Sequence, residues 1–155
     1  MRNASCFAPL VLAVFALAAV LFVTPALGDL GGDSAHYLLL ARALIDGNGY
    51  ADAFLPGAPL HAHYPPGFPL ILVPVVAAFG VHAFVAIKLW IVVLLVAGGA
   101  AAFLLLRRKA GAGVALMALV VALSVPAVVM DGGRIRSEAA LLPTMFFALL
   151  CAERA

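Results

Sequence analysis

The chain has 155 residues, of which 66% are hydrophobic and 10% are charged, and its formal net charge is +2. Soluble domains are roughly half apolar and about one quarter charged. The composition therefore excludes an ordinary soluble domain and predicts an all-α membrane protein that forms one membrane domain over residues 1–155. The densest basic run, Arg107–Lys109, contains no aromatic residue, which argues against nucleic-acid binding. A basic run beside an apolar segment is typical of the cytoplasmic side of a membrane.

Residues 7–27 are the first predicted transmembrane helix, because about 20 apolar residues cross ~30 Å of hydrocarbon. A competing interpretation is a signal peptide, since Arg2, the apolar run and Ala26-Leu27-Gly28 resemble one with a small-residue cleavage site. The length of the apolar run and the further apolar segments after it favour a retained helix.

Residues 28–66 are predicted to form an extracytoplasmic loop. Its polar part holds four of the seven acidic residues and three of the four histidines. Within the loop, residues 34–47 are predicted to form a short amphipathic helix that lies along the membrane interface. Asp33 or Ser34 is the expected N-cap of this helix.

The next segment, residues 67–80, is apolar but too short to span a bilayer, and it contains Pro69 and Pro74. It is predicted to be an interfacial or re-entrant segment. In the segment that follows it, Lys88 and Trp90 are expected near the outer headgroup layer.

Three further transmembrane helices are predicted, over residues 81–106, 113–130 and 138–152, which gives about four in all. The positive-inside rule then places the basic run 107–109 in the cytoplasm and the loop 28–66 outside. The expected location is the bacterial cytoplasmic (inner) membrane, with the chain crossing it several times and contacting lipid.

Four sequence segments occur in a suggestive order: D-S-A-H-Y (Asp33–Tyr37), A-R-A-L-I-D-G-N-G-Y (Ala41–Tyr50), H-Y-P-P-G-F-P-L (His63–Leu70) and R-S-E-A-A-L-L-P (Arg136–Pro143). This order resembles the N-terminal part of GT-C-fold glycosyltransferases of the protein O-mannosyltransferase and aminoarabinose-transferase type. The resemblance covers nearly the whole chain, and Y-P-P-G-F-P-L after an acid-opened helix is its most specific part. Family members are several hundred residues long, so the chain is expected to be an N-terminal fragment of one.

The resemblance implies an inverting transfer of a hexosyl or pentosyl group from a polyprenyl phosphate to an acceptor protein, lipid or glycan. It assigns the general base to Asp33, and partial burial at the interface is expected to tune this carboxylate for proton transfer. Helix capping is the alternative role for Asp33. The second acid of the family's Asp-Glu pair is replaced here by Ser34, so a divalent metal cofactor is not expected.

The remaining candidate residues are expected to bind the substrates. They are Tyr37, His61, His63, Tyr64, Lys88, Arg134, Arg136 and Glu138.

Each of these candidates also has a structural interpretation. The cations suit a donor phosphate, but Lys88 can instead snorkel, and the two arginines can lie in a solvated turn. Glu138 can simply favour a helix dipole. His61 and His63 form an H-x-H pair for which the sequence offers no clear third metal ligand. Asp29 is either a second carboxylate or the polar end of the first helix.

Two other functional classes stay open. A transporter-like protein predicts ionisable residues at mid-membrane depth, whereas Lys88 alone enters a predicted helix, and near its edge. A non-catalytic assembly or scaffold protein, or an inactive gene remnant, is compatible with the same composition.

Overall fold

The computed structural model describes residues 4–27 and 32–153, with side chains from residue 6 onward. Within these residues the chain forms seven α-helices. They are α1 (Ala4–Val20), α2 (Asp33–Ile45), α3 (Gly67–Phe79), α4 (Phe84–Ala110), α5 (Ala112–Leu123), α6 (Pro126–Asp131) and α7 (Glu138–Ala152). The predicted all-helical fold is confirmed for this part of the chain, where extended residues pair at a single isolated bridge between Ala51 and Leu60.

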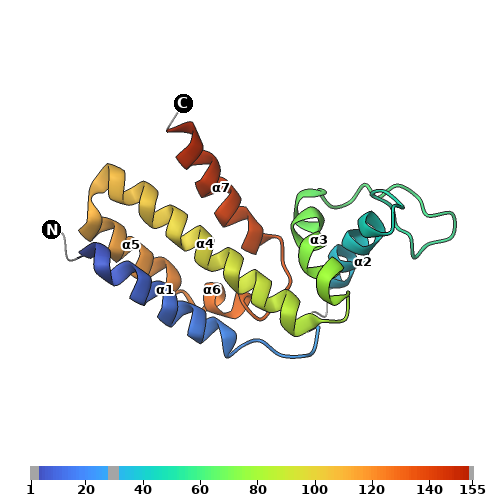
Figure 1. Cartoon of the computed structure of the whole chain (residues 1–155), viewed down its shortest axis with the longest axis horizontal. Coiled ribbons are helices and arrows are strands. Elements are labelled where there is room, and N and C mark those ends of the chain that lie inside the picture. The colour runs from blue at the N-terminus through green and yellow to red at the C-terminus, as the bar shows by residue number, and fades with distance from the viewer. Residues whose placement is uncertain (1–3, 28–31, 154–155) are drawn as a thin grey trace.

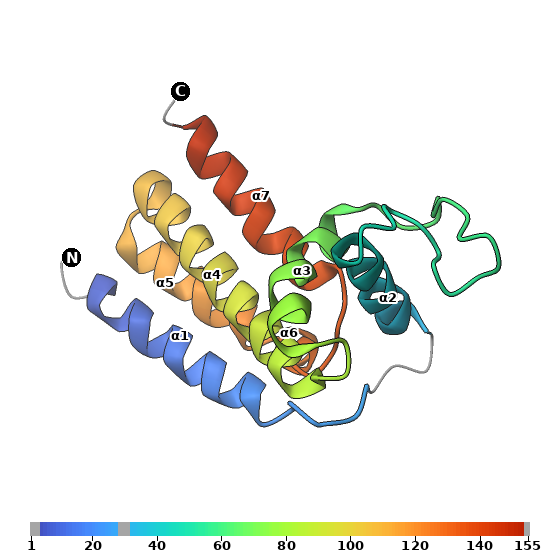
Figure 2. The same ribbon diagram turned by 45° about the vertical axis from the view of Figure 1, so that its right-hand side comes forward.

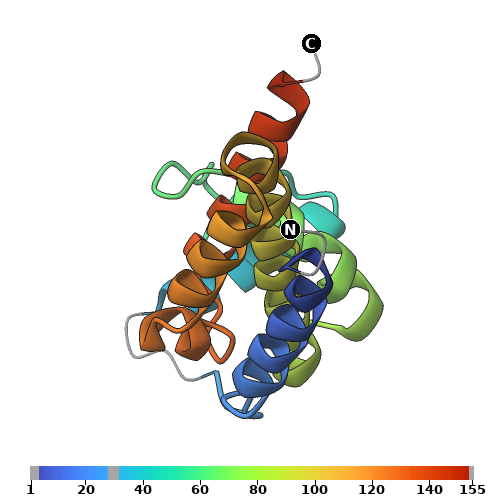
Figure 3. The same ribbon diagram turned by 90° about the vertical axis from the view of Figure 1, so that its left-hand side faces the viewer.

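Helix α4 is the central element of the arrangement. It packs against α1, α5 and α7, and α3 joins it to α2. Figures 1 and 2 show α1, α4 and α5 side by side. Helices α2 and α3 and the loop of residues 46–66 lie together at the end of this group where α4 begins. Helix α7 starts near that end and continues beside α4 (Figures 1 and 3), so that Leu150 packs against Leu105 and Glu153 lies 2.8 Å from Lys109. The basic run at the end of α4 therefore lies far from α2.

Length separates α4 from the other predicted transmembrane helices. Its 27 residues make it the one helix, among the described residues, that is long and apolar enough to cross a membrane. Helices α1, α5 and α7 have 17, 12 and 15 residues. A 12-residue helix rises only ~18 Å, compared with ~30 Å of hydrocarbon. By length and composition, the structure supports one membrane-spanning helix.

The first predicted helix, over residues 7–27, ends earlier than expected, at Val20. The N–H groups of Leu21 and Val23 bond to carbonyl oxygens three residues earlier, at 3.2 Å and 3.0 Å. This is the tighter pattern of a helix end. Pro25, five residues after Val20, has no N–H group to donate a further helical hydrogen bond.

The predicted helix over residues 113–130 is divided into two. Helix α5 ends at Leu123, and α6 begins at Pro126. A proline disfavours the helical conformation of the residue before it, and Val125 is accordingly extended, with φ −68° and ψ 120°. Pro126 itself occupies the first turn of α6, where no N–H donor is required.

Residues 67–80, which were predicted to be an interfacial or re-entrant segment, form the continuous helix α3 over Gly67–Phe79. Pro69 is tolerated because it lies in the first turn, where backbone N–H groups have no partner within the helix. One face of α3 is buried through Phe68, Leu72 and Val76 and belongs to the same apolar cluster as residues of α2.

The connection between α6 and α7, residues 132–137, passes very close to the end of α1. A Cβ atom at Gly133 would lie 2.5 Å from the carbonyl oxygen of Phe22, so this position requires glycine. Ile135 is fully buried, and its carbonyl oxygen accepts a hydrogen bond from Ser34 Oγ at 2.9 Å. The α6–α7 connection is therefore fixed to the first turn of α2.

Candidate functional site

Asp33 is the first residue of α2, and its side chain does not cap the helix. The N-cap is Gly32, whose φ of 82° lies in the left-handed region, and no side-chain capping bond is present. The capping roles predicted for Asp33 and Ser34 are therefore wrong. Asp33 Oδ1 instead accepts a hydrogen bond from the Tyr64 hydroxyl at 2.6 Å.

The Asp33 carboxylate is exposed rather than partly buried as expected. Its exposure follows from its place at the start of α2, beyond the apolar cluster that buries the next turn. Tyr64 occupies one carboxylate oxygen, and within the described residues the other oxygen has no hydrogen-bond partner. Asp29, the other candidate carboxylate, lies outside the described residues.

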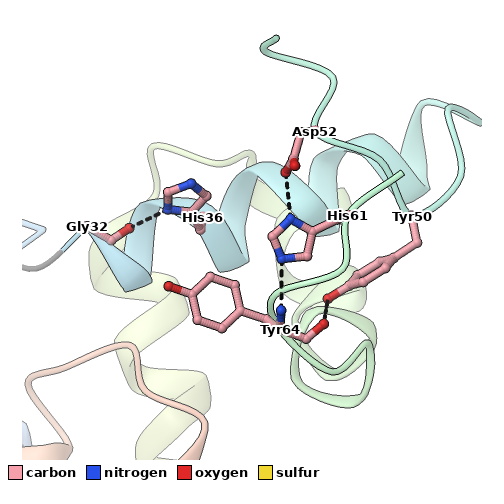
Figure 4. A network of polar contacts seen from close by, with 6 residues as sticks. All are labelled: Gly32, His36, Tyr50, Asp52, His61 and Tyr64. Atoms are coloured by element: carbon pink, nitrogen blue, oxygen red, sulfur yellow. Dashed lines mark hydrogen bonds and ion pairs between the residues drawn. The ribbon is translucent and has the colours of Figure 1, made fainter. Parts of the chain in front are cut away.

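Tyr64 is held in place through its backbone as well as through its ring. Its N–H donates to His61 Nε2 at 2.9 Å, and its carbonyl oxygen accepts from the Tyr50 hydroxyl at 2.8 Å. Its ring stacks on that of His61, with centroids 5.4 Å apart. Figure 4 shows the phenol ring extending from this anchored backbone toward the start of α2.

Tyr50 remains a reliable hydrogen-bond donor in this arrangement. Burial is the main factor that raises the pKa of Tyr50 above its ordinary value, and Tyr37 and Asp52 add to the rise. The Tyr50 phenol therefore keeps its proton at physiological pH, and with it the bond to the Tyr64 carbonyl oxygen.

The two histidines of the H-x-H pair have different environments. The His61 side chain is only 5% exposed, and its Nδ1 lies 2.7 Å from Asp52 Oδ1. Both of its ring nitrogens are therefore engaged by protein groups. The His63 side chain is exposed and packs edge-on against Tyr64, with centroids 4.6 Å apart. The pair does not present two free nitrogens to a metal, and the described residues contain no cluster of three or more potential metal ligands.

The start of α7 meets α2 close to this network. The Tyr37 hydroxyl donates to Ser137 Oγ at 3.4 Å, and Ser137 Oγ lies 3.5 Å from Glu138 Oε2. The Tyr37 ring also contacts the ring of Tyr64, with centroids 4.8 Å apart. Segments that are about 100 residues apart in the chain are thus brought together.

A cleft of about 330 Å³ opens between α3 and α7 at this junction. Its apolar wall includes Phe68, Ile71 and Leu141, and Tyr37 borders it from α2. Ser137 and Glu138 contribute polar groups. Asp33 does not line the cleft. It accepts a hydrogen bond from Tyr64, the Tyr64 ring contacts the Tyr37 ring, and Tyr37 lines the cleft.

Arg134 and Arg136 lie in the α6–α7 connection, where Arg134 is half-buried and Arg136 is exposed. Within the described residues neither guanidinium forms a hydrogen bond or an ion pair. Burial raises the pKa of the nearby Asp131. The positive charges of Arg136 and Arg134 oppose this rise, and Glu138 adds to it. The two arginines thus keep donor groups for an anion.

Lys88 has neither of the two roles that its sequence position suggested. Its side chain is 0% exposed, and Nζ donates to Thr24 O at 3.1 Å, Thr24 Oγ1 at 3.1 Å and Ala26 O at 2.6 Å. An ammonium group has three N–H donors, so this set uses all of them. Lys88 neither snorkels to the headgroups nor faces a donor phosphate, because it links α4 to the residues that follow α1.

Sequence reasoning did not single out Ser137 as a site residue, and it assigned Ser34 a structural role with the wrong partner. Ser137 is part of R-S-E-A, but its contact with Tyr37 depends on the packing of α7 beside α2. Ser34 was considered as a helix cap, although its partner is Ile135. Neither contact has a local sequence signal, since each joins residues at least 100 positions apart.

Comparison of the chain with models of protein families, with curated proteins and with solved structures gave no match. The geometry of the site and the resemblance of its motifs therefore carry the functional argument.

Replacing Lys88 by Met should destabilise the fold, because the oxygens of Thr24 and Ala26 would lose the donor that links α4 to the residues after α1. We expect a loss of about 2–4 kcal/mol in the free energy of unfolding. Denaturation in detergent micelles can be followed through the fluorescence of Trp90, the single tryptophan. The matched control is Lys109→Met, whose side chain is 63% exposed in an ion pair with Glu153. It should lose about 0.5 kcal/mol or less. Equal losses in the two variants would contradict the structural role of Lys88.

Proposed function

We propose that this chain forms part of an integral membrane glycosyltransferase of the GT-C type. The enzyme moves a sugar from a polyprenyl-phosphate donor to an acceptor hydroxyl at the extracytoplasmic face. The supporting observation is that three motif segments meet at one end of the fold. Asp33 contacts Tyr64 at 2.6 Å, and Tyr37 contacts both Tyr64 and Ser137.

In the proposed reaction, Asp33 is the general base. Its second carboxylate oxygen takes the proton of the acceptor hydroxyl while the acceptor oxygen forms a bond to the anomeric carbon of the sugar. The bond from that carbon to the phosphate oxygen breaks, and the electron pair leaves with the polyprenyl phosphate. Attack opposite the leaving group inverts the anomeric centre. The Tyr64 hydroxyl fixes the carboxylate in position, as a general base requires.

Charge distribution favours separate places for the phosphate and the sugar. Among the described residues the guanidinium groups of Arg134 and Arg136 have no hydrogen-bond or ion-pair partner, and their donors suit the charge that develops on a departing phosphate. The cleft between α3 and α7 has an acid, Glu138, and an aromatic residue, Phe68, among its lining residues. An acid repels a phosphate but accepts hydrogen bonds from sugar hydroxyls. We therefore assign the sugar to the cleft and the phosphate to the two arginines.

A multi-pass membrane location is part of the same proposal. The shorter helices expose large apolar side chains, including Leu17 of α1, Met117 of α5 and Leu141 of α7, each more than 60% exposed. Such surfaces are unusual in contact with water and suit a lipid environment. Helices α1, α5 and α7 would then cross the bilayer beside α4, with local thinning or partner helices compensating for their length.

The proposal predicts that Asp33→Asn lowers sugar transfer by at least about 10²-fold, because Asn cannot accept the proton. Transfer of a radiolabelled sugar from a polyprenyl phosphate can be measured in membranes from cells that express the gene encoding this chain. Membrane insertion should be unchanged, because the Asp33 side chain is exposed.

The matched control for this change is Asp46→Asn, at the other end of α2. Asp46 forms an exposed ion pair with Arg42 at 2.7 Å, and within the described residues it forms no side-chain hydrogen bond or ion pair with a candidate site residue. Its loss should leave transfer unchanged. Full turnover in the Asp33 variant, or an equal loss in the Asp46 variant, would refute the assignment of the base.

Cysteine labelling tests the proposed orientation. In a Cys6→Ala, Cys151→Ala background, we expect Leu60→Cys, at a position 83% exposed in the loop, to react with an impermeant thiol reagent on intact cells. Arg108→Cys should react only after the membrane is permeabilised, because Arg108 lies at the distant end of α4. Labelling of both positions from the same side would contradict this orientation.

A further inference from the structure

The hydrogen bonds of His61 define its protonation state. The Tyr64 N–H is a donor and lies 2.9 Å from His61 Nε2, so Nε2 must present a lone pair. The ring proton of a neutral imidazole is then on Nδ1, which donates it to Asp52 Oδ1 at 2.7 Å. The arrangement in Figure 4 is therefore possible only for neutral His61 in its Nδ1–H form.

We propose that His61 is a pH-dependent positioning residue that holds Tyr64, and through Tyr64 the Asp33 carboxylate. Protonation at Nε2 would place a hydrogen atom against the Tyr64 N–H, so that two donors would face each other. The Tyr64 backbone would lose this bond. The Asp52 contact would persist, because an imidazolium still donates from Nδ1 to a carboxylate.

The groups around His61 determine what protonation changes. Asp52 lies at Nδ1, and the rings of Tyr50 and Tyr64 lie on either side, with centroids 5.5 Å and 5.4 Å away. From α2, the titratable neighbour is His36, whose ring centroid is 6.4 Å away and whose Nδ1 lies 3.2 Å from the Gly32 carbonyl oxygen. Asp52 is the charged group in direct contact, and it compensates an imidazolium. Protonation therefore breaks the hydrogen bond to Tyr64 and turns the hydrogen bond to Asp52 into an ion pair.

The release of Tyr64 is partial. Its carbonyl oxygen still accepts from the Tyr50 hydroxyl at 2.8 Å, and its ring still packs against that of Tyr37, with centroids 4.8 Å apart. The Tyr64 phenol gains freedom to leave Asp33 Oδ1, to which it donates at 2.6 Å. At acidic pH the carboxylate thus loses its fixed orientation. Any effect of this on sugar transfer rests on the proposed function, whereas the effect on Tyr64 does not.

Residue-resolved amide hydrogen exchange tests the inference on the full chain in lipid nanodiscs. After correction for the intrinsic pH dependence of exchange, protection of the Tyr64 amide should fall at least about fivefold between about pH 8 and pH 5. The amides of Asp52 and His61 bond to backbone carbonyl oxygens, at 2.9 Å and 3.0 Å, and serve as internal controls. Their protection should change less than about twofold.

The variant His61→Gln isolates the titration. A glutamine amide can accept from the Tyr64 N–H and donate to Asp52, but it gains no proton in this pH range. Protection of Tyr64 at pH 8 should survive and its pH dependence should disappear. The matched control is His63→Gln, in the same loop at an exposed position without a hydrogen bond among the described residues. It should retain the full pH dependence.

A second measurement does not depend on any variant. Nitrogen-15 NMR of the histidine side chains should show the Nδ1–H form for His61 at about pH 8 and the imidazolium at acidic pH. An Nε2–H form, a pH-independent Tyr64 amide in the unmodified chain, or an unchanged pH dependence in the His61 variant would each overturn the inference. Loss of sugar transfer in the Asp33 variant without any effect of pH on Tyr64 would support the proposed function and still refute the role of His61.

Discussion

Ser34 donates a buried hydrogen bond to the carbonyl oxygen of Ile135, 101 residues further along the chain. Both residues are fully buried. Loss of the Ser34 hydroxyl would leave the buried Ile135 carbonyl oxygen without this donor and would lower the free energy of unfolding by about 1–3 kcal/mol. The bond fixes the start of α2 against the α6–α7 connection. Because Asp33 precedes Ser34 directly and Tyr37 follows one helical turn later, the position of every α2 side chain at the site depends on this contact.

Two different kinds of interaction then order the rest of the site. Aromatic packing joins Tyr37 to Tyr64 and to Phe68 of α3, and Tyr37 and Phe68 line the cleft. Backbone hydrogen bonds from His61 and Tyr50 hold Tyr64 from the opposite side. The result is a carboxylate that is exposed to solvent but oriented through Tyr64, whose backbone is held by the buried His61 side chain. This separation suits a residue that must meet an acceptor from solution and still be fixed in direction.

The sequence predicted the helices well where local chemistry decides them. Helix α7 covers residues 138–152, as expected, and the short helix expected over 34–47 was found at Asp33–Ile45. Prolines lie at both differences: Pro25 follows the early end of the first helix, and Pro126 divides the predicted helix 113–130. Both prolines are visible in the sequence, but the apolar residues on either side of them favoured the prediction of a longer helix.

The site could be predicted only as a set of residue types, since its geometry depends on contacts distant in the chain. The resemblance pointed to Asp33 and to the R-S-E segment, yet no local pattern shows that Tyr64 reaches the carboxylate. Lys88 illustrates the same limit, because an amine inside an apolar helix finds acceptors that only the folded chain reveals. His61 was grouped with His63 by spacing, whereas packing buries one ring and exposes the other.

The site depends on the link between α2 and the α6–α7 connection, and the variant Ser34→Ala removes that link. Ser124→Ala is the control, because Ser124 Oγ bonds within its own helix, to Val120 O at 2.6 Å. Amide hydrogen exchange of the full chain should become faster in both the first turn of α2 and residues 132–137 when Ser34 is replaced, and in neither segment when Ser124 is replaced. Unchanged exchange in residues 132–137 of the Ser34 variant would contradict the claim that this bond joins the two halves of the site.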